Sequence, residues 1–166
     1  MRTLARAAVA VTATLALANC TGSPGATKIG RDAPLEEPAP EVSRVRSSDV
    51  ACLAEAIYFE ARGTGVKGES AVAHVVVNRA QSPKFPNSVC GVVADGCQFS
   101  YRCDGHPEVL ADRGARSQAF RIAETVLAGA PDITSGALFF HSARMEPGWF
   151  NTRPRVGNFG GNIFYR

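Results

Sequence analysis

The residue of this sequence best suited to acid–base chemistry is Glu60, which follows an apolar and aromatic run in the segment Ala56–Gly63. Apolar surroundings remove water from a carboxyl group, disfavour its charged form and so raise its pKa. A glutamic acid that stays protonated near neutral pH can deliver a proton to the oxygen of a departing sugar, as cleavage of a glycosidic bond requires. The structural alternative is a glutamate at a helix end, paired with Arg62 or Lys67.

Two other glutamates lie near Glu60 in the sequence, and neither has a comparable setting. Glu55 is five positions earlier, on a different face of the same expected helix, where we expect a solvated or salt-bridged role. Glu69 falls in the first turn of the next expected helix, where a carboxylate complements the helix dipole. Glu69 stays a candidate second carboxylate, because a water-using glycosidase needs a pair.

A second group of polar and aromatic side chains lies in the cysteine-bounded segment 97–105. Amide, hydroxyl and carboxylate groups bind sugar hydroxyls, and aromatic faces stack on sugar rings. A histidine beside two phenylalanines near the C-terminus repeats this chemistry. The alternative is a disulfide-stapled surface turn. The candidate substrate-binding residues are Gln98, Phe99, Ser100, Tyr101, Asp104 and His141.

His74 and Asn78 are four residues apart among valines, so they share one face of an expected helix. Buried polar groups need hydrogen-bond partners. We therefore expect a core histidine bound to backbone, and an asparagine that can brace a loop.

Residues 1–20 have the pattern of an export signal, with Arg2 and Arg6 before an uncharged apolar run and small residues at its end. The run is shorter than the roughly 20 apolar residues that a membrane helix needs. Residues 21–47 are rich in proline, glycine and small polar residues, which predicts a flexible tether. Residues 48–166 remain, enough for one domain with a single core.

The end of the signal fits two kinds of processing, and both stay open. Ala16 and Ala18 form a small-x-small cleavage site, whereas Leu17 to Cys20 resembles a lipoprotein box. Cleavage would release a soluble protein, and lipidation of Cys20 would anchor it to a membrane. Either outcome predicts an exported protein of the periplasm or cell envelope.

The net charge of +3 is mild and predicts no nucleic-acid binding. A slight positive bias suits an anionic polymer as partner. One compact domain on a tether predicts a monomer.

The four cysteines of the domain are an even number in an exported chain, which predicts two disulfides. Four cysteines allow three pairings. We favour Cys52 with Cys103 and Cys90 with Cys97, because a bond from Cys52 to this loop would hold it beside the helix that carries Glu60.

A zinc site at Cys97, Cys103 and His106 is the alternative use of these thiols. The chain has no CxxC pair, and an oxidising compartment favours disulfides. We expect neither a metal nor a cofactor.

Apolar periodicity predicts helices from Ser48 or Asp49 to Gly63, over 69–80 and over 114–128. Proline and glycine make 82–107 a stapled, loop-rich segment with at most a short helix or hairpin. The remainder is aromatic and irregular, apart from a short strand at 163–165.

Between about Cys52 and Tyr165, the chain resembles the SleB/CwlJ-type cell wall hydrolase family. The resemblance implies a lysozyme-like or lytic-transglycosylase-like single domain of the α+β class, mainly helical with a small β element. It also implies cleavage of peptidoglycan glycan strands with Glu60 as the catalytic acid. The segments that carry it, in this order, are Ala56–Gly63, Ala71–Arg79, Ser82–Val93, Gln98–Ser100, Cys103–Gly105 and Ile163–Tyr165.

The chain departs from the family pattern at a few positions. Thr64 stands where the second glutamate of an EARGE-like motif is usual, and Asn162 stands where a histidine is usual. His141 matches the last histidine of an HYH-like segment whose first position is Phe139. These departures put full activity in question but not the fold.

Two mechanisms and two other functions remain open. A lytic transglycosylase needs one acid and yields a 1,6-anhydro product, and we favour it over a muramidase that uses water and two carboxyl groups. The main rival is a non-catalytic peptidoglycan-binding envelope lipoprotein. A disulfide-rich inhibitor of another exported enzyme is a third reading, supported by the cysteines alone.

Overall fold

A computed structural model of the protein describes residues 45–166. The expected export signal at 1–20, the candidate lipidation site Cys20 and nearly all of the expected tether at 21–47 lie outside the described residues. No helix within 45–166 has both the length and the apolar character needed to cross a membrane.

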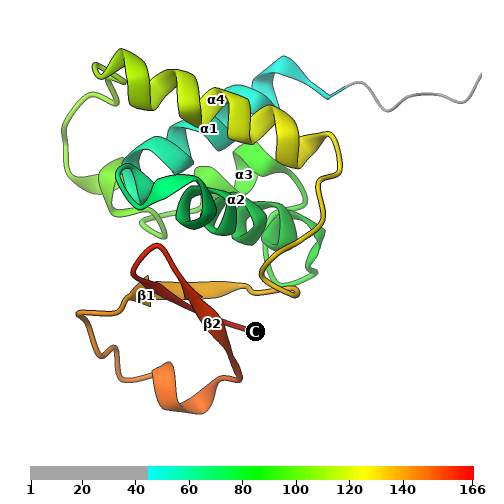
Figure 1. Cartoon of the computed structure of the whole chain (residues 1–166), viewed down its shortest axis with the longest axis vertical. Coiled ribbons are helices and arrows are strands. Elements are labelled where there is room, and N and C mark those ends of the chain that lie inside the picture. The colour runs from blue at the N-terminus through cyan, green and yellow to red at the C-terminus, as the bar shows by residue number, and fades with distance from the viewer. Residues whose placement is uncertain (1–44) are drawn as a thin grey trace, which may run out of the picture. The chain divides into compact units, whose positions relative to one another are not determined.

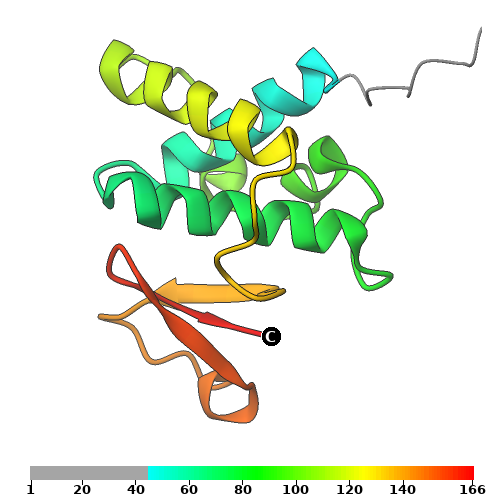
Figure 2. The same cartoon turned by 45° about the vertical axis from the view of Figure 1, so that its right-hand side comes forward.

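Residues 45–166 form stacked layers of helices over a small antiparallel sheet (Figure 1). Turning the molecule shows α2 between the sheet on one side and α1 with α4 on the other (Figure 2). The α+β, mainly helical class implied by the family resemblance is confirmed. The elements are α1 (Ser47–Ala61), α2 (Gly65–Gln81), α3 (Val89–Val93), η1 (Ser100–Cys103), α4 (Arg113–Leu127), β1 (Phe139–Ser142), η2 (Phe150–Thr152), β2 (Arg155–Phe159) and β3 (Asn162–Tyr165).

The three long helices predicted from the sequence are all present, but their starts differ from the expectation. Neither Ser48 nor Asp49 caps α1, because the helix begins one residue earlier and Asp49 forms an ion pair of 2.9 Å with Arg46 instead. The second helix begins at Gly65, four residues before the predicted start at 69. At α4 the Asp112 carboxylate accepts a hydrogen bond from the Ala115 amide at 3.0 Å, as an N-cap does.

The sheet has the order β1-β3-β2, with both pairings antiparallel. The strand expected at 163–165 is therefore its central strand, whereas β1 and β2 lie in the segment that was expected to be irregular. Phe164 is fully buried and points toward α2, where it packs with Val72 and Val75. This contact joins the sheet to the helices.

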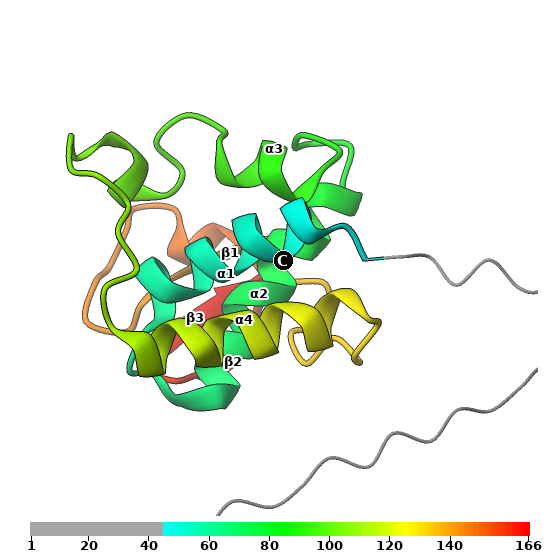
Figure 3. The same ribbon diagram turned by 90° about the horizontal axis from the view of Figure 1, so that it is seen from above.

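The predicted disulfide pairing is wrong, although all four cysteines are bonded. The bonds are Cys52–Cys90, with 5.2 Å between the Cα atoms, and Cys97–Cys103, with 5.7 Å. Ser88 caps α3 through the Gly91 amide, and α3 lies against α1, which brings Cys90 to Cys52 (Figure 3). The zinc alternative does not fit, because the thiols that it needs are oxidised.

The tip of the β2–β3 hairpin packs against the first turn of α2, where Gly160 and Gly68 approach each other closely. A Cβ atom built on Gly160 would lie 2.7 Å from Thr64 Cβ and 2.8 Å from Gly68 Cα. Gly160 also has a φ of +59°, in the left-handed region. Both constraints require glycine at this position.

We expect Gly160→Ala to lower the free energy of unfolding by roughly 2–4 kcal/mol, since overpacking and a left-handed alanine both cost free energy. Gly161→Ala is the matched control: its φ is +84°, but nothing lies within 4 Å of the added Cβ. It should lose only about 1–2 kcal/mol. Urea unfolding of the variants measures the difference, and equal losses would contradict the proposed close packing.

Candidate active site

The Glu60 carboxyl group lies in the last turn of α1, half-buried and without an ion pair or hydrogen bond within residues 45–166. The partners considered from the sequence are engaged elsewhere. Arg62 donates to the Tyr58 hydroxyl at 2.6 Å, and the Lys67 ammonium lies 5.3 Å from the centre of the Phe159 ring. Burial raises the pKa of Glu60 above its usual value. The structure therefore gives this group the setting of a proton donor.

Among residues 45–166, the charge of Arg79 in α2 acts on Glu60 and lowers the pKa that burial raises. Arg79 is itself 5% exposed, and its Nε donates to the Leu138 carbonyl at 2.8 Å. Its guanidinium carbon lies 5.2 Å from the centre of the Phe85 ring and 5.7 Å from that of Phe99. Burial lowers the pKa of Arg79 to about 10, so it remains a cation at neutral pH.

Tyr101 of η1 lies near the same carboxyl group. Its ring stacks on Phe59 with 4.5 Å between centroids, and its buried hydroxyl forms no hydrogen bond within the described chain. Burial and the neighbouring carboxylates of Glu55 and Glu60 raise the pKa of Tyr101, so the hydroxyl keeps its proton. Glu55 itself forms an ion pair of 3.1 Å with Arg102, which is one of the two roles expected for it.

The other candidate residues of the 97–105 segment divide by exposure. Phe99 is 1% exposed and belongs to the core beside Arg79, so it has no face to offer a sugar and we do not propose substrate contact for it. Asp104 accepts a hydrogen bond from the His106 amide at 2.8 Å. Gln98, Ser100 and Asp104 are exposed.

His141 of β1 is 9% exposed, and both of its ring nitrogens are engaged. Nδ1 lies 2.8 Å from the Ser142 carbonyl and Nε2 lies 2.9 Å from the Tyr165 hydroxyl. A carbonyl oxygen can only accept, so the proton is on Nδ1 and the Tyr165 hydroxyl donates to Nε2. His141 therefore offers its ring to a pocket of about 300 Å³ rather than a hydrogen bond.

Glu69 and Thr64 both have structural partners. Glu69 is 4% exposed and accepts a hydrogen bond of 2.6 Å from Gln118 of α4. The Thr64 hydroxyl donates to the Ala61 carbonyl at 2.7 Å, at the end of α1. The Glu69 carboxylate is thus engaged by Gln118, and Thr64 has no carboxylate to offer as a partner for Glu60.

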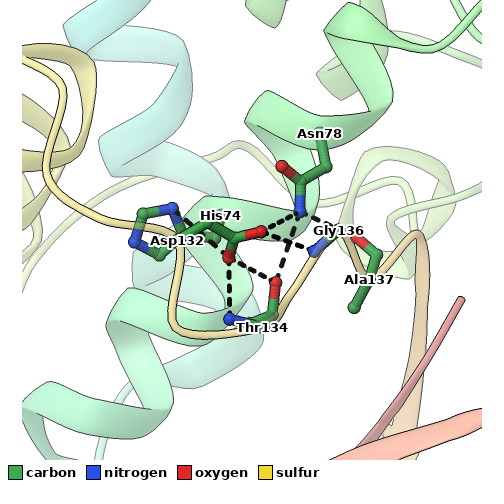
Figure 4. Close-up of polar contacts among 6 residues, drawn as sticks. All are labelled: His74, Asn78, Asp132, Thr134, Gly136 and Ala137. Carbon is green, nitrogen blue, oxygen red and sulfur yellow. Dashed lines mark hydrogen bonds and ion pairs between the residues drawn. The ribbon is translucent and has the colours of Figure 1, made fainter.

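A polar network around the Asp132 carboxylate fixes the connection from α4 to β1 (Figure 4). Asn78 donates to the Asp132 carboxylate at 3.0 Å and to the Ala137 carbonyl at 3.2 Å. The same carboxylate accepts bonds from the Thr134 and Gly136 amides at 2.7 and 2.6 Å. Asn78 thus braces a loop, as the sequence suggests, and that loop leads to the Leu138 carbonyl that binds Arg79.

His74 is buried as expected. Its polar contact, however, is with the side chain of Asp132 rather than with a backbone group. Its Nδ1 lies 3.7 Å from Asp132. Burial lowers the pKa of His74, and the charge of Asp132 opposes that shift. The Asp132 carboxylate is 58 residues further along the chain than His74, so no local pattern could pair it with this helix.

The sequence pattern of a family described as Cell Wall Hydrolase matches residues 63–165. The range begins just after Glu60. Spore cortex-lytic enzymes from Halalkalibacterium halodurans and Bacillus subtilis are 33% and 31% identical over 70% and 71% of this chain. These stretches are 34% and 37% of the relatives' own lengths, so the chain spans little more than a third of the curated relatives that it matches.

Two solved structures are similar to this chain over nearly their whole length. The catalytic domain of the germination-specific lytic transglycosylase SleB from Bacillus anthracis gives a TM-score of 0.61 at 29% identity, covering 75% of this chain and 98% of that one. The catalytic domain of the Bacillus cereus SleB protein gives the same TM-score and identity, covering 77% and 98%.

We expect Arg79→Met to raise the pKa of Glu60 further, because it removes the cation that opposes desolvation. Arg79→Lys keeps a positive charge and should raise this pKa less. A carboxyl-carbon NMR titration of Glu60 measures the shift in each folded variant. An unchanged pKa in folded Arg79→Met would show that Arg79 does not set the electrostatics of this carboxyl group.

We expect Asp132→Asn to lower the free energy of unfolding by about 2 kcal/mol near neutral pH, since hydrogen bonds to a charged acceptor are lost. Burial tends to raise the pKa of Asp132, but the bonds from Thr134, Gly136 and Asn78 hold it below its usual value. The stabilisation is thus fully present above the unfolded pKa of about 4 and is lost as pH falls through the folded pKa.

Urea unfolding at neutral pH and at about pH 3 should therefore show a deficit for Asp132→Asn that shrinks in acid. Asp104→Asn is the matched control, because an asparagine oxygen can keep its bond to the His106 amide. A deficit that is independent of pH would contradict the role given to the charge of Asp132.

Proposed function

The chain belongs to the cell wall hydrolase family, and on that premise we propose that its 48–166 domain cleaves the glycan strands of peptidoglycan. Glu60 acts as the general acid and then as the general base. The proposal is supported by the relatives named as cortex-lytic enzymes and by the fold shared with a lytic transglycosylase domain. The observation that carries it is the half-buried Glu60 carboxyl, which has no ion pair among the described residues and a raised pKa.

Protonation of the leaving sugar oxygen is the first step that this setting supports. Glu60 gives its proton to that oxygen while the glycosidic bond breaks, and the resulting carboxylate becomes the base for the second step. Activity is expected to fall as pH rises through the pKa of Glu60, because the acid form is then lost. The neighbouring Arg79 stabilises the carboxylate produced by the first step.

The second step favours a lytic transglycosylase over a muramidase that uses water. The 6-hydroxyl of the muramyl residue attacks its own anomeric carbon, and Glu60 accepts the hydroxyl proton, which yields a 1,6-anhydro end. A water-using mechanism would employ a second carboxyl group. Glu69 is bound to Gln118 and Glu55 to Arg102, so neither is poised for that role.

Substrate contact is proposed for the exposed part of the 97–105 segment and for the residues that border it. The exposed amide, hydroxyl and carboxylate groups can bind sugar hydroxyls, and the ring of His141 can contact an apolar sugar face. The residues assigned to this role are Gln98, Ser100, Asp104 and His141. Tyr101, which is 8% exposed with a buried hydroxyl, is assigned a supporting position beside Phe59.

The family departures at Thr64 and Asn162 have structural uses in this chain. Thr64 binds the last carbonyl of α1, and Asn162 is 8% exposed in the central strand. We infer that both positions support the scaffold rather than the chemistry. An envelope lipoprotein that binds peptidoglycan without cleaving it is the second candidate, because these same two positions differ from the family pattern.

We further propose export to the periplasm or cell envelope, where the protein works as a monomer. Two disulfides within the described chain suit an oxidising compartment. Lipidation at Cys20 and the 21–47 tether would let the domain reach the wall from a membrane, and mass spectrometry of the mature N-terminus tests this.

Purified protein incubated with peptidoglycan should release soluble muropeptides, and Glu60→Gln should reduce release by at least about a hundredfold, since it removes the proton donor. Glu69→Gln is the matched control and should keep most of the activity. Mass spectrometry of the products should find 1,6-anhydro ends. Wild-type protein that sediments with peptidoglycan but releases nothing would favour the binding lipoprotein instead.

A further inference from the structure

A pocket of about 300 Å³ lies on the face of the sheet opposite the helices. Side chains of a strand alternate between its two faces. Phe164 points toward α2, so its neighbours Ile163 and Tyr165 point to the other side, where both line this pocket. The segment that carries η2 lies on that side of the sheet and forms the opposite wall (Figure 1).

Two arginines line this pocket, and neither has an acidic partner. Arg153 lies with its guanidinium carbon 3.5 Å from the centre of the Phe139 ring, and its Nε is buried without a hydrogen bond within residues 45–166. Arg155 is exposed on β2. Among the described residues, no carboxylate oxygen lies within 4.0 Å of either guanidinium. A ring face offsets part of the desolvation of Arg153 but leaves its N–H donors free.

The remaining polar groups of the pocket leave the arginines as its main donors. The Tyr165 hydroxyl donates to His141 Nε2, so its proton is not available to a ligand. Asn151 adds an exposed amide. Glu146 is the one acidic residue of the lining, and two cations against one anion leave the pocket positive.

We propose that this pocket binds a carboxylate of the peptidoglycan substrate through Arg153 and Arg155, an inference that rests on the proposed function. A guanidinium matches a carboxylate with two parallel N–H donors. Muramic acid carries a carboxylate on its lactyl group when it is unsubstituted, and on its stem peptide when it is substituted. The pocket thus selects strands whose muramic acids bear an acidic group.

A continuous row of side chains connects this pocket with the candidate acid. Arg79, whose charge acts on Glu60, lies 5.2 Å from the Phe85 ring centre. The ring centroids of Phe85 and Phe139 are 6.1 Å apart. The Arg153 guanidinium lies over the other ring of this pair, that of Phe139. These contacts lead from the pocket to the cation that acts on Glu60, and the proposal places both on one bound glycan strand.

The test measures binding of soluble muropeptides by calorimetry to the full chain carrying Glu60→Gln, so that no turnover occurs. One ligand is a disaccharide with an acidic stem peptide, the second is the same molecule with its carboxyl groups amidated, and the third is the disaccharide with a free lactyl carboxylate and no peptide. We expect a ligand that presents the recognised carboxylate to bind about 10- to 100-fold more tightly than the amidated one, which loses the charge-assisted hydrogen bonds. The third ligand identifies the source: tight binding assigns the lactyl carboxylate, and weak binding assigns the stem peptide.

Variants in the same background locate the effect in the pocket. Arg155→Gln and Arg153→Lys should each weaken binding of the acidic ligand about tenfold or more, while Glu146→Gln should strengthen it, because it removes the one opposing charge. Arg144→Gln is the matched control, since this exposed arginine of the same segment does not line the pocket. Circular dichroism checks that each variant is folded.

Equal binding of all three ligands, or unchanged binding of the tightest ligand in folded Arg155→Gln and Arg153→Lys, would overturn the carboxylate pocket. The proposed function fails by a different measurement, namely the absence of released muropeptides with unmodified Glu60. The two failures are therefore distinguishable.

Discussion

The buried cation of Arg79 is the interaction on which the helices, the sheet and the candidate acid all depend. Removing a guanidinium from water is costly unless its donors and charge are compensated. Here the Leu138 carbonyl, two phenylalanine rings and nearby carboxylates supply that compensation. Because the carbonyl belongs to the residue just before β1, satisfying Arg79 also fixes where the sheet lies relative to α2. One side chain, Arg79, thus both lowers the pKa of Glu60 and holds the sheet in place against α2.

The helices and the candidate acid were predictable because their causes are local. Apolar side chains at helical spacing define α1, and the same neighbours desolvate Glu60 at its end. The edge strands were not predictable from periodicity. β1 has only four residues, and a register shift between Arg155 and Gly157 breaks the alternation in β2. Both strands form because they pair with β3, and the sequences of β1 and β2 alone do not predict that pairing.

The partners of the site residues come from tertiary packing, which one sequence does not contain. Gln118 reaches Glu69 across 49 residues, and Asp132 reaches Asn78 across 54. The disulfide pairing depended in the same way on α3, a helix of five residues whose position against α1 no spacing rule predicts. Arg79 itself had no distinguishing pattern in the sequence, because its helix also contains Lys67 and Glu69. Asn78 and Arg79 each bind the segment that leads into β1.

The strand order β1-β3-β2 has a consequence for biosynthesis. The central strand is the last of the three to be made, so neither edge strand has a hydrogen-bonding partner until residues 162–165 have been synthesised. The wall of the arginine-lined pocket that β3 provides is missing until then as well. With the export proposed above, a chain that crosses a membrane in extended form would therefore complete this pocket only after its last strand has crossed.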